Sequence, residues 1–194
     1  MIDRYTSEEM GKLWSQENKY LKWLEVELYA CKAWHKKGKI PTAVLKRIIK
    51  KARFDVKRID KIEETVKHDV IAFLTSVAEF VGPESRYIHM GLTSSDVVDT
   101  AFALLLRDSS NIIIDDIKNF MEVLKAKAIE HKDTVMMGRS HGVHAEPTTF
   151  GLKMALYYEE MGRNLERMIA AREVISHGKL SGAVGTYSII DPAT

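Results

Sequence analysis

The stretch SSDVVDTAFALLLRDSSNIIIDDIKNFMEVLKAKAIE, residues 94–130, decides how this chain folds. It contains neither glycine nor proline, and apolar residues such as Val98, Leu105 and Leu124 recur at helical spacing. At a rise of 1.5 Å per residue the stretch would form a rod of roughly 55 Å, although the polar run RDSSN at 107–111 offers a place for a bend. A second long helical pattern runs from residue 148 to about residue 176.

Residues 1–93 have a different character. Shorter helical patterns occupy about 14–37, 41–51, 55–66 and 69–81, and glycine, proline or polar residues separate them. In the first of these, Leu21, Leu24, Leu28 and Cys31 are expected to form one buried stripe. Before it, TSEEM at 6–10 predicts a capping box with Thr6 as the N-cap and Glu9 as its partner.

These patterns predict an all-α protein with two domains. The first is a small helical domain at 1–93, and the second, at 94–194, is the beginning of a bundle of long helices with short extended segments near 135–147 and 179–188. Two long helices cannot enclose a core, because each leaves apolar surface uncovered. We therefore expect the missing helices to come from other subunits, from chain that follows residue 194, or from both.

Composition narrows the class of function. Lysine and arginine number 29 against 27 acidic residues, so the net charge of +2 gives no reason to expect nucleic acid or an anionic membrane as a partner. The basic run KRIIKKARFDVKR at 46–58 alternates with apolar residues and is typical of a solvated helical hairpin, with a phosphate-backbone contact as the alternative. A single cysteine, no signal-peptide pattern and no long apolar run together predict a cytoplasmic protein.

The start of the long helix gathers hydroxyl groups. In IHMGLTSSDVVDTAF, residues 88–102, Thr93, Ser94, Ser95 and Asp96 follow Gly91, which permits a tight turn. Thr93 and Asp96 fit a helix cap. The same cluster of hydroxyls and free amides at a helix N-terminus also suits an anion, so capping and anion binding both stay open here.

Two further stretches carry polar side chains at helix starts. His68 and Asp69 stand in VKHDVIAFL at 66–74, where Asp69 is the expected cap and His68 is either a surface histidine or a functional one. Arg4 and Tyr5 precede the first capping box. The planar donors of an arginine suit a phosphate or a carboxylate, although an arginine near an N-terminus is also common without any function.

The stretch GRSHGVHAEPTTFG, residues 138–151, places His141 and His144 among small residues. A zinc site needs at least three protein ligands, and no further ligand stands at a suitable spacing, so we predict no metal. Ser140 and Gly142 would let a substrate approach His141, and an imidazole suits proton transfer near neutral pH. Glu146 is then available to orient a neighbouring imidazole.

Four stretches, in their order and spacing, resemble the adenylosuccinate lyase family of the fumarase/aspartase superfamily: KHDV (67–70), HMGLTSSD (89–96), GRSHGVHAEPTTFG (138–151) and KLSGAVGTY (179–187). The resemblance runs from Arg4 to Pro192. It implies a homotetramer built on a central bundle of long helices, with each active site assembled from three subunits. It also implies β-elimination of fumarate without a cofactor, from adenylosuccinate to give AMP and from the succinylated aminoimidazole carboxamide ribotide (SAICAR) to give AICAR.

The resemblance also implies roles for single residues. His141 matches the general acid that protonates the departing nitrogen, and His68 matches its partner in orienting the substrate. Substrate-binding positions are matched by Arg4, Tyr5, Lys67, His68, Asp69, His89, Thr93, Ser94 and Ser140. Among these, Arg4 and Tyr5 match contacts to the nucleotide phosphate, which argininosuccinate lyase and fumarase substrates lack. His144 would be structural, and Ser140 stands where many relatives have threonine.

One part of the family pattern has no counterpart in residues 1–194. The family's proton-abstracting serine lies on a flexible downstream loop with a lysine and an asparagine, and no stretch of this sequence matches that loop. The sequence is therefore expected to be the N-terminal part of the enzyme and inactive alone. The alternative from a different functional class is a helical oligomerisation or nucleotide-binding module without catalysis.

Overall fold

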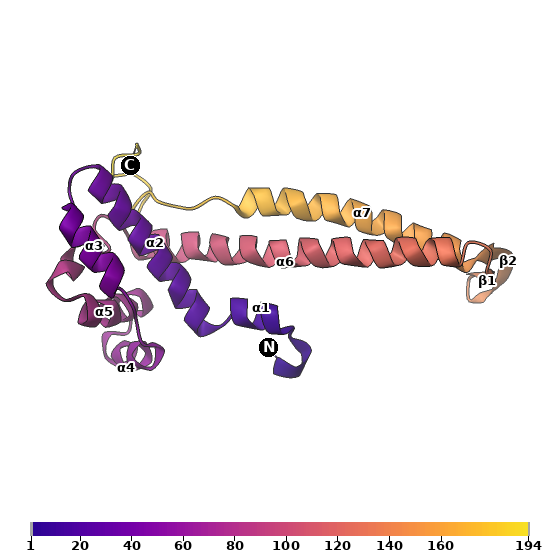
Figure 1. The fold of residues 1–194 in the computed structure, drawn as a ribbon, viewed down its shortest axis with the longest axis horizontal. Helices are drawn as coiled ribbons and strands as arrows, with labels where there is room; N and C mark the ends of the chain where they lie inside the picture. The colour runs from indigo at the N-terminus through magenta and orange to yellow at the C-terminus, as the bar shows by residue number, and fades with distance from the viewer. Residues whose placement is uncertain (1, 194) are drawn as a thin grey trace. The chain divides into compact units, whose positions relative to one another are not determined.

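The computed structural model describes residues 2–193, except for the side chain of Asp3. Contacts divide the chain into two compact units, Met1–Leu106 with Ser176–Thr194 and Arg107–Ile175. We call these the first unit and the second unit. Figure 1 labels their main helices and strands. The all-α expectation is confirmed, because the only strands among the described residues form one two-stranded sheet. The predicted domain boundary after residue 93 stays a prediction.

The first unit consists of short helices and the start of a long one. Its helices are η1 (Asp3–Tyr5), α1 (Glu8–Leu13), α2 (Gln16–Lys36), α3 (Thr42–Lys51), α4 (Val56–Val66), α5 (Asp69–Val81), η2 (Gly82–Tyr87) and the first turns of α6 (Ser94–Glu130). Helix α6 continues without a break through the polar run at 107–111, where a bend was possible. The second unit holds the rest of α6, strands β1 (Val135–Ser140) and β2 (Val143–Thr149), and α7 (Phe150–Ile175).

An aromatic cluster forms the centre of the first unit. Tyr20 stacks on Phe73 with ring centroids 5.7 Å apart, and Trp23 meets the same ring edge-on at 5.5 Å. All three side chains are buried. The stripe expected on α2 is therefore partly wrong: Leu24 and Cys31 are buried, but Leu21 is 48% exposed and the charged Glu27 is fully buried.

Side chains other than the expected ones cap several helices. Ser7, not Thr6, caps α1 by accepting a hydrogen bond from the Met10 amide. Thr6 instead donates its hydroxyl to the carbonyl of Ile2, so its oxygen serves the turn before the helix. The capping pattern thus located the helix but not the capping residue, since neighbouring hydroxyls have the same local preference.

In the second unit the hairpin of β1 and β2 joins α6 to α7. The strands pair antiparallel from Val135 opposite Thr149 to Ser140 opposite Val143, with an irregularity between Met137 and Arg139. These strands confirm the extended segment expected near 135–147, whereas 179–188 in the first unit forms no strand and contains bends and a turn. None of the helices in the described part of the chain is long and apolar enough to cross a membrane.

Candidate functional site

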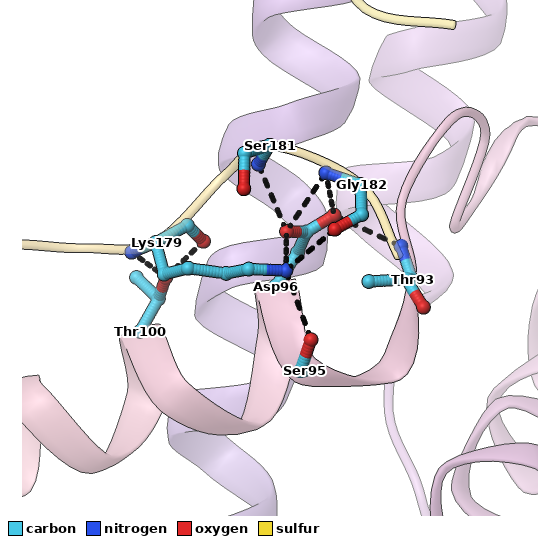
Figure 2. A network of polar contacts seen from close by, with 7 residues as sticks. All are labelled: Thr93, Ser95, Asp96, Thr100, Lys179, Ser181 and Gly182. Carbon is cyan, nitrogen blue, oxygen red and sulfur yellow. Dashed lines mark hydrogen bonds and ion pairs between the residues drawn. The ribbon is translucent and has the colours of Figure 1, made fainter. Parts of the chain in front are cut away.

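The start of α6 is built around the carboxylate of Asp96 (Figure 2), whose side chain is fully buried. Its Oδ2 accepts a hydrogen bond from the Thr93 amide at 2.9 Å, which closes the first turn of the helix. Its Oδ1 accepts from the Lys179 ammonium at 2.8 Å and from the Ser181 amide at 3.0 Å. The carboxylate therefore ties the helix start to a segment that is more than eighty residues away in the sequence.

The charge of Asp96 is compensated inside the protein. Burial by itself raises the pKa of this carboxyl, but the hydrogen bond from Lys179 and those from the Thr93 and Ser181 amides lower the pKa below its ordinary value. The negative charge also lies at the N-terminus of a helix, where the backbone dipole favours it. A buried carboxylate with these partners is a stable anion at neutral pH.

The hydrogen bonds of Asp96 bear on the two interpretations of the TSSD stretch at 93–96, which are helix capping and anion binding. Asp96 itself supplies the anion at the helix start, so capping is confirmed for the Thr93 amide. The side-chain hydroxyls of Thr93 and Ser94 are part-buried and make no hydrogen bond within the described residues. They are therefore available to a ligand, and anion binding by these hydroxyls stays a prediction.

The residues Lys67, His68 and Asp69 form the junction between α4 and α5. Lys67 ends α4 with a left-handed backbone at φ 54°, which turns the chain sharply. His68, and not the expected Asp69, caps α5 through Nδ1, which accepts from the Ile71 amide at 3.5 Å. Asp69 is the first residue of the helix and accepts from its neighbour Val70. The His68 imidazole is 46% exposed, so it can still be reached from solvent.

A buried carboxylate that sequence reasoning missed holds His89. The Glu27 side chain is fully buried and accepts from the His89 amide at 2.8 Å and from its ring Nδ1 at 2.6 Å. Because a carboxylate only accepts, Nδ1 carries the proton in this contact. The pair also stabilises the unusual backbone of His89, at φ 63°. A charged residue on the apolar stripe of α2 was the signal that could have revealed it.

Arg4 and Tyr5 lie on η1 and are both exposed. The Arg4 guanidinium stands over the Tyr5 ring, 4.8 Å from its centroid, so the two side chains form one cation–π pair. No hydrogen bond links this pair to the other predicted site residues among those described.

His141 lies at the tip of the hairpin in the second unit. His141 and Gly142 both have positive φ, 53° and 75°, as the central residues of a type I′ turn require. Ser140, His141 and His144 are all exposed. The expectation that Glu146 orients one of these imidazoles is not met, because Glu146 makes no ion pair or hydrogen bond with either histidine in the described structure.

The predicted site residues fall into two groups. Ser140 and His141 belong to the second unit, and all the others belong to the first. Within the first unit, a cavity of about 170 Å³ brings the TSSD and KLSGAVGTY stretches together, since Thr93, Gly182 and Tyr187 all line it. Cys31 is buried in the core, and burial raises the pKa of its thiol to about 12. No cluster of potential metal ligands occurs among the described residues.

Comparison with known proteins gives a family match and two similar enzymes. A family model described as Lyase matches residues 3–194. The chain is similar to adenylosuccinate lyase of Aquifex aeolicus (strain VF5), with 60% identity over 99% of this chain and 45% of that protein. It is also similar to adenylosuccinate lyase of Bacillus subtilis (strain 168), with 54% identity over 99% of this chain and 44% of that protein.

A solved structure is similar throughout the chain. The fumarate lyase of Mesorhizobium sp. BNC1 superposes with a TM-score of 0.89 at 28% identity, over 96% of this chain and 45% of that one. The chain thus spans a little less than half the length of the relatives that it matches.

Proposed function

Because this chain belongs to the lyase family, we propose that the protein of which it is part is an adenylosuccinate lyase of purine biosynthesis. The reaction is β-elimination of fumarate, from adenylosuccinate to give AMP and from SAICAR to give AICAR. The observation that carries this proposal is the identity of 60% to an adenylosuccinate lyase over 99% of the chain. The solved fumarate lyase is only 28% identical over nearly the same span.

The chemistry that the proposal needs matches the residues available. Elimination beside a carboxylate builds negative charge, which fixed donors must stabilise. Thr93 and Ser94 offer hydroxyls at a helix N-terminus, where an anion is favoured. The exposed imidazole of His141 is the general acid for the departing nitrogen, and a turn with two positive φ values holds it. His68 is its partner.

The remaining roles concern substrate binding and assembly. Arg4 and Tyr5 bind the nucleotide phosphate, and Lys67, Asp69, His89 and Ser140 complete the binding surface. The catalytic base comes from outside residues 1–194. The protein is a cytoplasmic homotetramer that uses no cofactor and binds neither nucleic acid nor membrane. The proposed tetramer is supported by the apolar side chains that the second unit exposes, among them Phe120, Ile129 and Leu156.

Two histidines of the same hairpin provide the decisive test. In the full-length enzyme, His141→Asn should lower kcat by about 10²–10⁴-fold, the usual contribution of a positioned acid. Asparagine tolerates the left-handed backbone of residue 141, so the turn should persist. His144→Asn is the matched control, because His144 is equally exposed but has no predicted role. Release of fumarate from adenylosuccinate is the measurement.

The outcomes separate the two functional classes. If the wild-type enzyme releases fumarate and both variants keep that activity, His141 is not the acid. If the wild-type full-length protein releases no fumarate, the lyase proposal itself is wrong and a non-catalytic helical module takes its place. Arg4→Ala gives a second check, since losing a phosphate contact should raise KM sharply and leave the unfolding midpoint unchanged.

A further inference from the structure

A segment that precedes the C-terminal turns crosses the start of α6 and is attached to it at two points. We call residues 178–182 the strap. The hydroxyl of Thr100 accepts from the Lys179 amide at 3.0 Å and donates to the Lys179 carbonyl at 2.8 Å. The approach is close, because a Cβ on Gly178 would lie 3.0 Å from the Thr100 methyl group. The second attachment is the ion pair of Lys179 with Asp96 (Figure 2).

The ammonium of Lys179 has no hydrogen-bonding capacity left for a substrate. It donates to Asp96 Oδ1 at 2.8 Å and to Ser95 Oγ at 2.9 Å. It also donates to the Gly182 carbonyl at 2.8 Å, which folds the strap back on itself. An ammonium group has three N–H donors, so these contacts use all of them. Lys179 must therefore act through the groups that it holds.

The groups that Lys179 holds are next to the predicted substrate-binding hydroxyls of Thr93 and Ser94. Ser95 and Asp96 follow Thr93 and Ser94 in the first turn of α6, and Asp96 also accepts from the Thr93 amide. On the other side, the strap residue Gly182 lines the same cavity as Thr93. The Lys179 ammonium is thus hydrogen-bonded to Gly182 on one side of that cavity and, through Asp96, to the Thr93 amide on the other.

We propose that Lys179 and Asp96 are positioning residues, which hold the hydroxyls of Thr93 and Ser94 against the strap in the geometry that binds the substrate's anionic groups. This inference rests on the proposed lyase function. It predicts that the ion pair matters to substrate binding beyond its contribution to the fold.

The double variant Lys179→Met with Asp96→Asn separates these two contributions. Replacing a buried ion pair by neutral groups of similar volume often leaves stability nearly unchanged, whereas removing one partner leaves an uncompensated charge. The double variant of the full-length enzyme should therefore still fold, but with a lower unfolding midpoint, because the asparagine that replaces Asp96 places an N–H donor where a carboxylate oxygen accepted from backbone amides. Its KM for adenylosuccinate should rise by about tenfold and its kcat/KM should fall by about 10²-fold, as expected when binding groups are misplaced by about 1 Å.

The matched control is an ion pair of the first unit that lies on the surface. Arg58 and Glu79 are joined at 2.6 Å with both side chains more than 40% exposed. The double variant Arg58→Met with Glu79→Gln should keep the wild-type KM and kcat. Hydrogen exchange at residues 91–95, measured without substrate, should become faster in the Lys179 and Asp96 double variant and stay unchanged in this control.

Each outcome has one meaning. An active wild-type enzyme whose Lys179 and Asp96 double variant folds and keeps the wild-type KM overturns the inference and leaves the lyase proposal intact. A wild-type enzyme that releases no fumarate overturns the lyase proposal and this inference together. If the double variant does not fold, Lys179→Arg decides, because it keeps the positive charge beside Asp96 but replaces the ammonium that donates to Ser95 and Gly182 by a longer, planar group. It should raise KM by about fivefold, as expected for the loss of about 1 kcal/mol, and an unchanged KM would overturn the inference.

Discussion

Asp96 in the first unit is fully buried and accepts hydrogen bonds from Lys179 and from backbone amides, whereas His141 in the second unit is exposed and makes none among the described residues. Glu27 is likewise fully buried and accepts hydrogen bonds, whereas Glu146, like His141, is exposed. The first unit therefore fixes its polar groups through tertiary hydrogen bonds. The hairpin fixes its groups through backbone conformation alone and leaves their side chains open. Single substitutions of the buried polar groups in the first unit should accordingly act on stability, whereas substitutions of the exposed side chains in the hairpin should act mainly on activity.

The largest effect on stability is expected at Glu27. Glu27→Ala removes both hydrogen bonds to His89 and leaves a buried space, so it should lower the free energy of unfolding by about 3 kcal/mol. Glu146→Ala is the counterpart in the hairpin, and since its side chain is exposed, the change should be within about 0.5 kcal/mol. Urea unfolding of both variants measures the difference. Equal losses would show that the two regions do not differ as described.

The next effect concerns the pH dependence of stability. The pKa of Asp96 is lowered by its hydrogen bonds in the folded state, so the unfolded chain binds the proton more tightly. The resulting stabilisation is present above the unfolded pKa of about 3.9 and is lost as pH falls through the lower folded value. Asp96→Asn should therefore flatten the acid side of the stability profile. An equally steep fall in the variant would assign the acid sensitivity to other carboxyls.

A smaller loss is expected in the hairpin backbone. Gly142 has φ +75° and a Cβ there would meet nothing within 4 Å, so the cost of Gly142→Ala comes only from conformation. We expect a loss of about 1 kcal/mol in the free energy of unfolding, together with a lower kcat because the turn presents His141. A loss of stability with unchanged kcat would show that the conformation of the turn does not affect the role of His141 in the reaction.

The smallest effect has the opposite sign and serves as the reference for the hairpin. Gly162 lies inside α7, and a Cβ there would meet only the Met121 side chain, at 3.7 Å. Gly162→Ala should therefore raise the free energy of unfolding by about 0.5–1 kcal/mol, because glycine is unfavourable inside a helix. Thermal unfolding of Gly162→Ala, compared with that of Gly142→Ala, would test this prediction. A loss at this position would mean that Gly162 packs against a surface outside this chain.

Several features could be predicted from local pattern. Hydrophobic spacing located the helices, including the long stretch at 94–130, because helical periodicity depends only on residues a few positions apart. The extended segment expected near 135–147 is present as two strands, but the turn that carries His141 between them was not predicted. The capping signals were less precise: they placed helix starts, yet the capping side chains were Ser7 and His68 rather than Thr6 and Asp69.

The sequence by itself determined an all-α chain and a lyase family resemblance. The first follows from the spacing of hydrophobic residues and the second from short sequence motifs. Only the tertiary structure decided that Glu27 is buried against His89 and that Lys179 is paired with Asp96. These partners are 62 and 83 residues apart in the sequence. No local pattern specifies which distant donor reaches a buried carboxylate, because that choice follows from how the helices pack and from the cost of leaving such a charge unpaired.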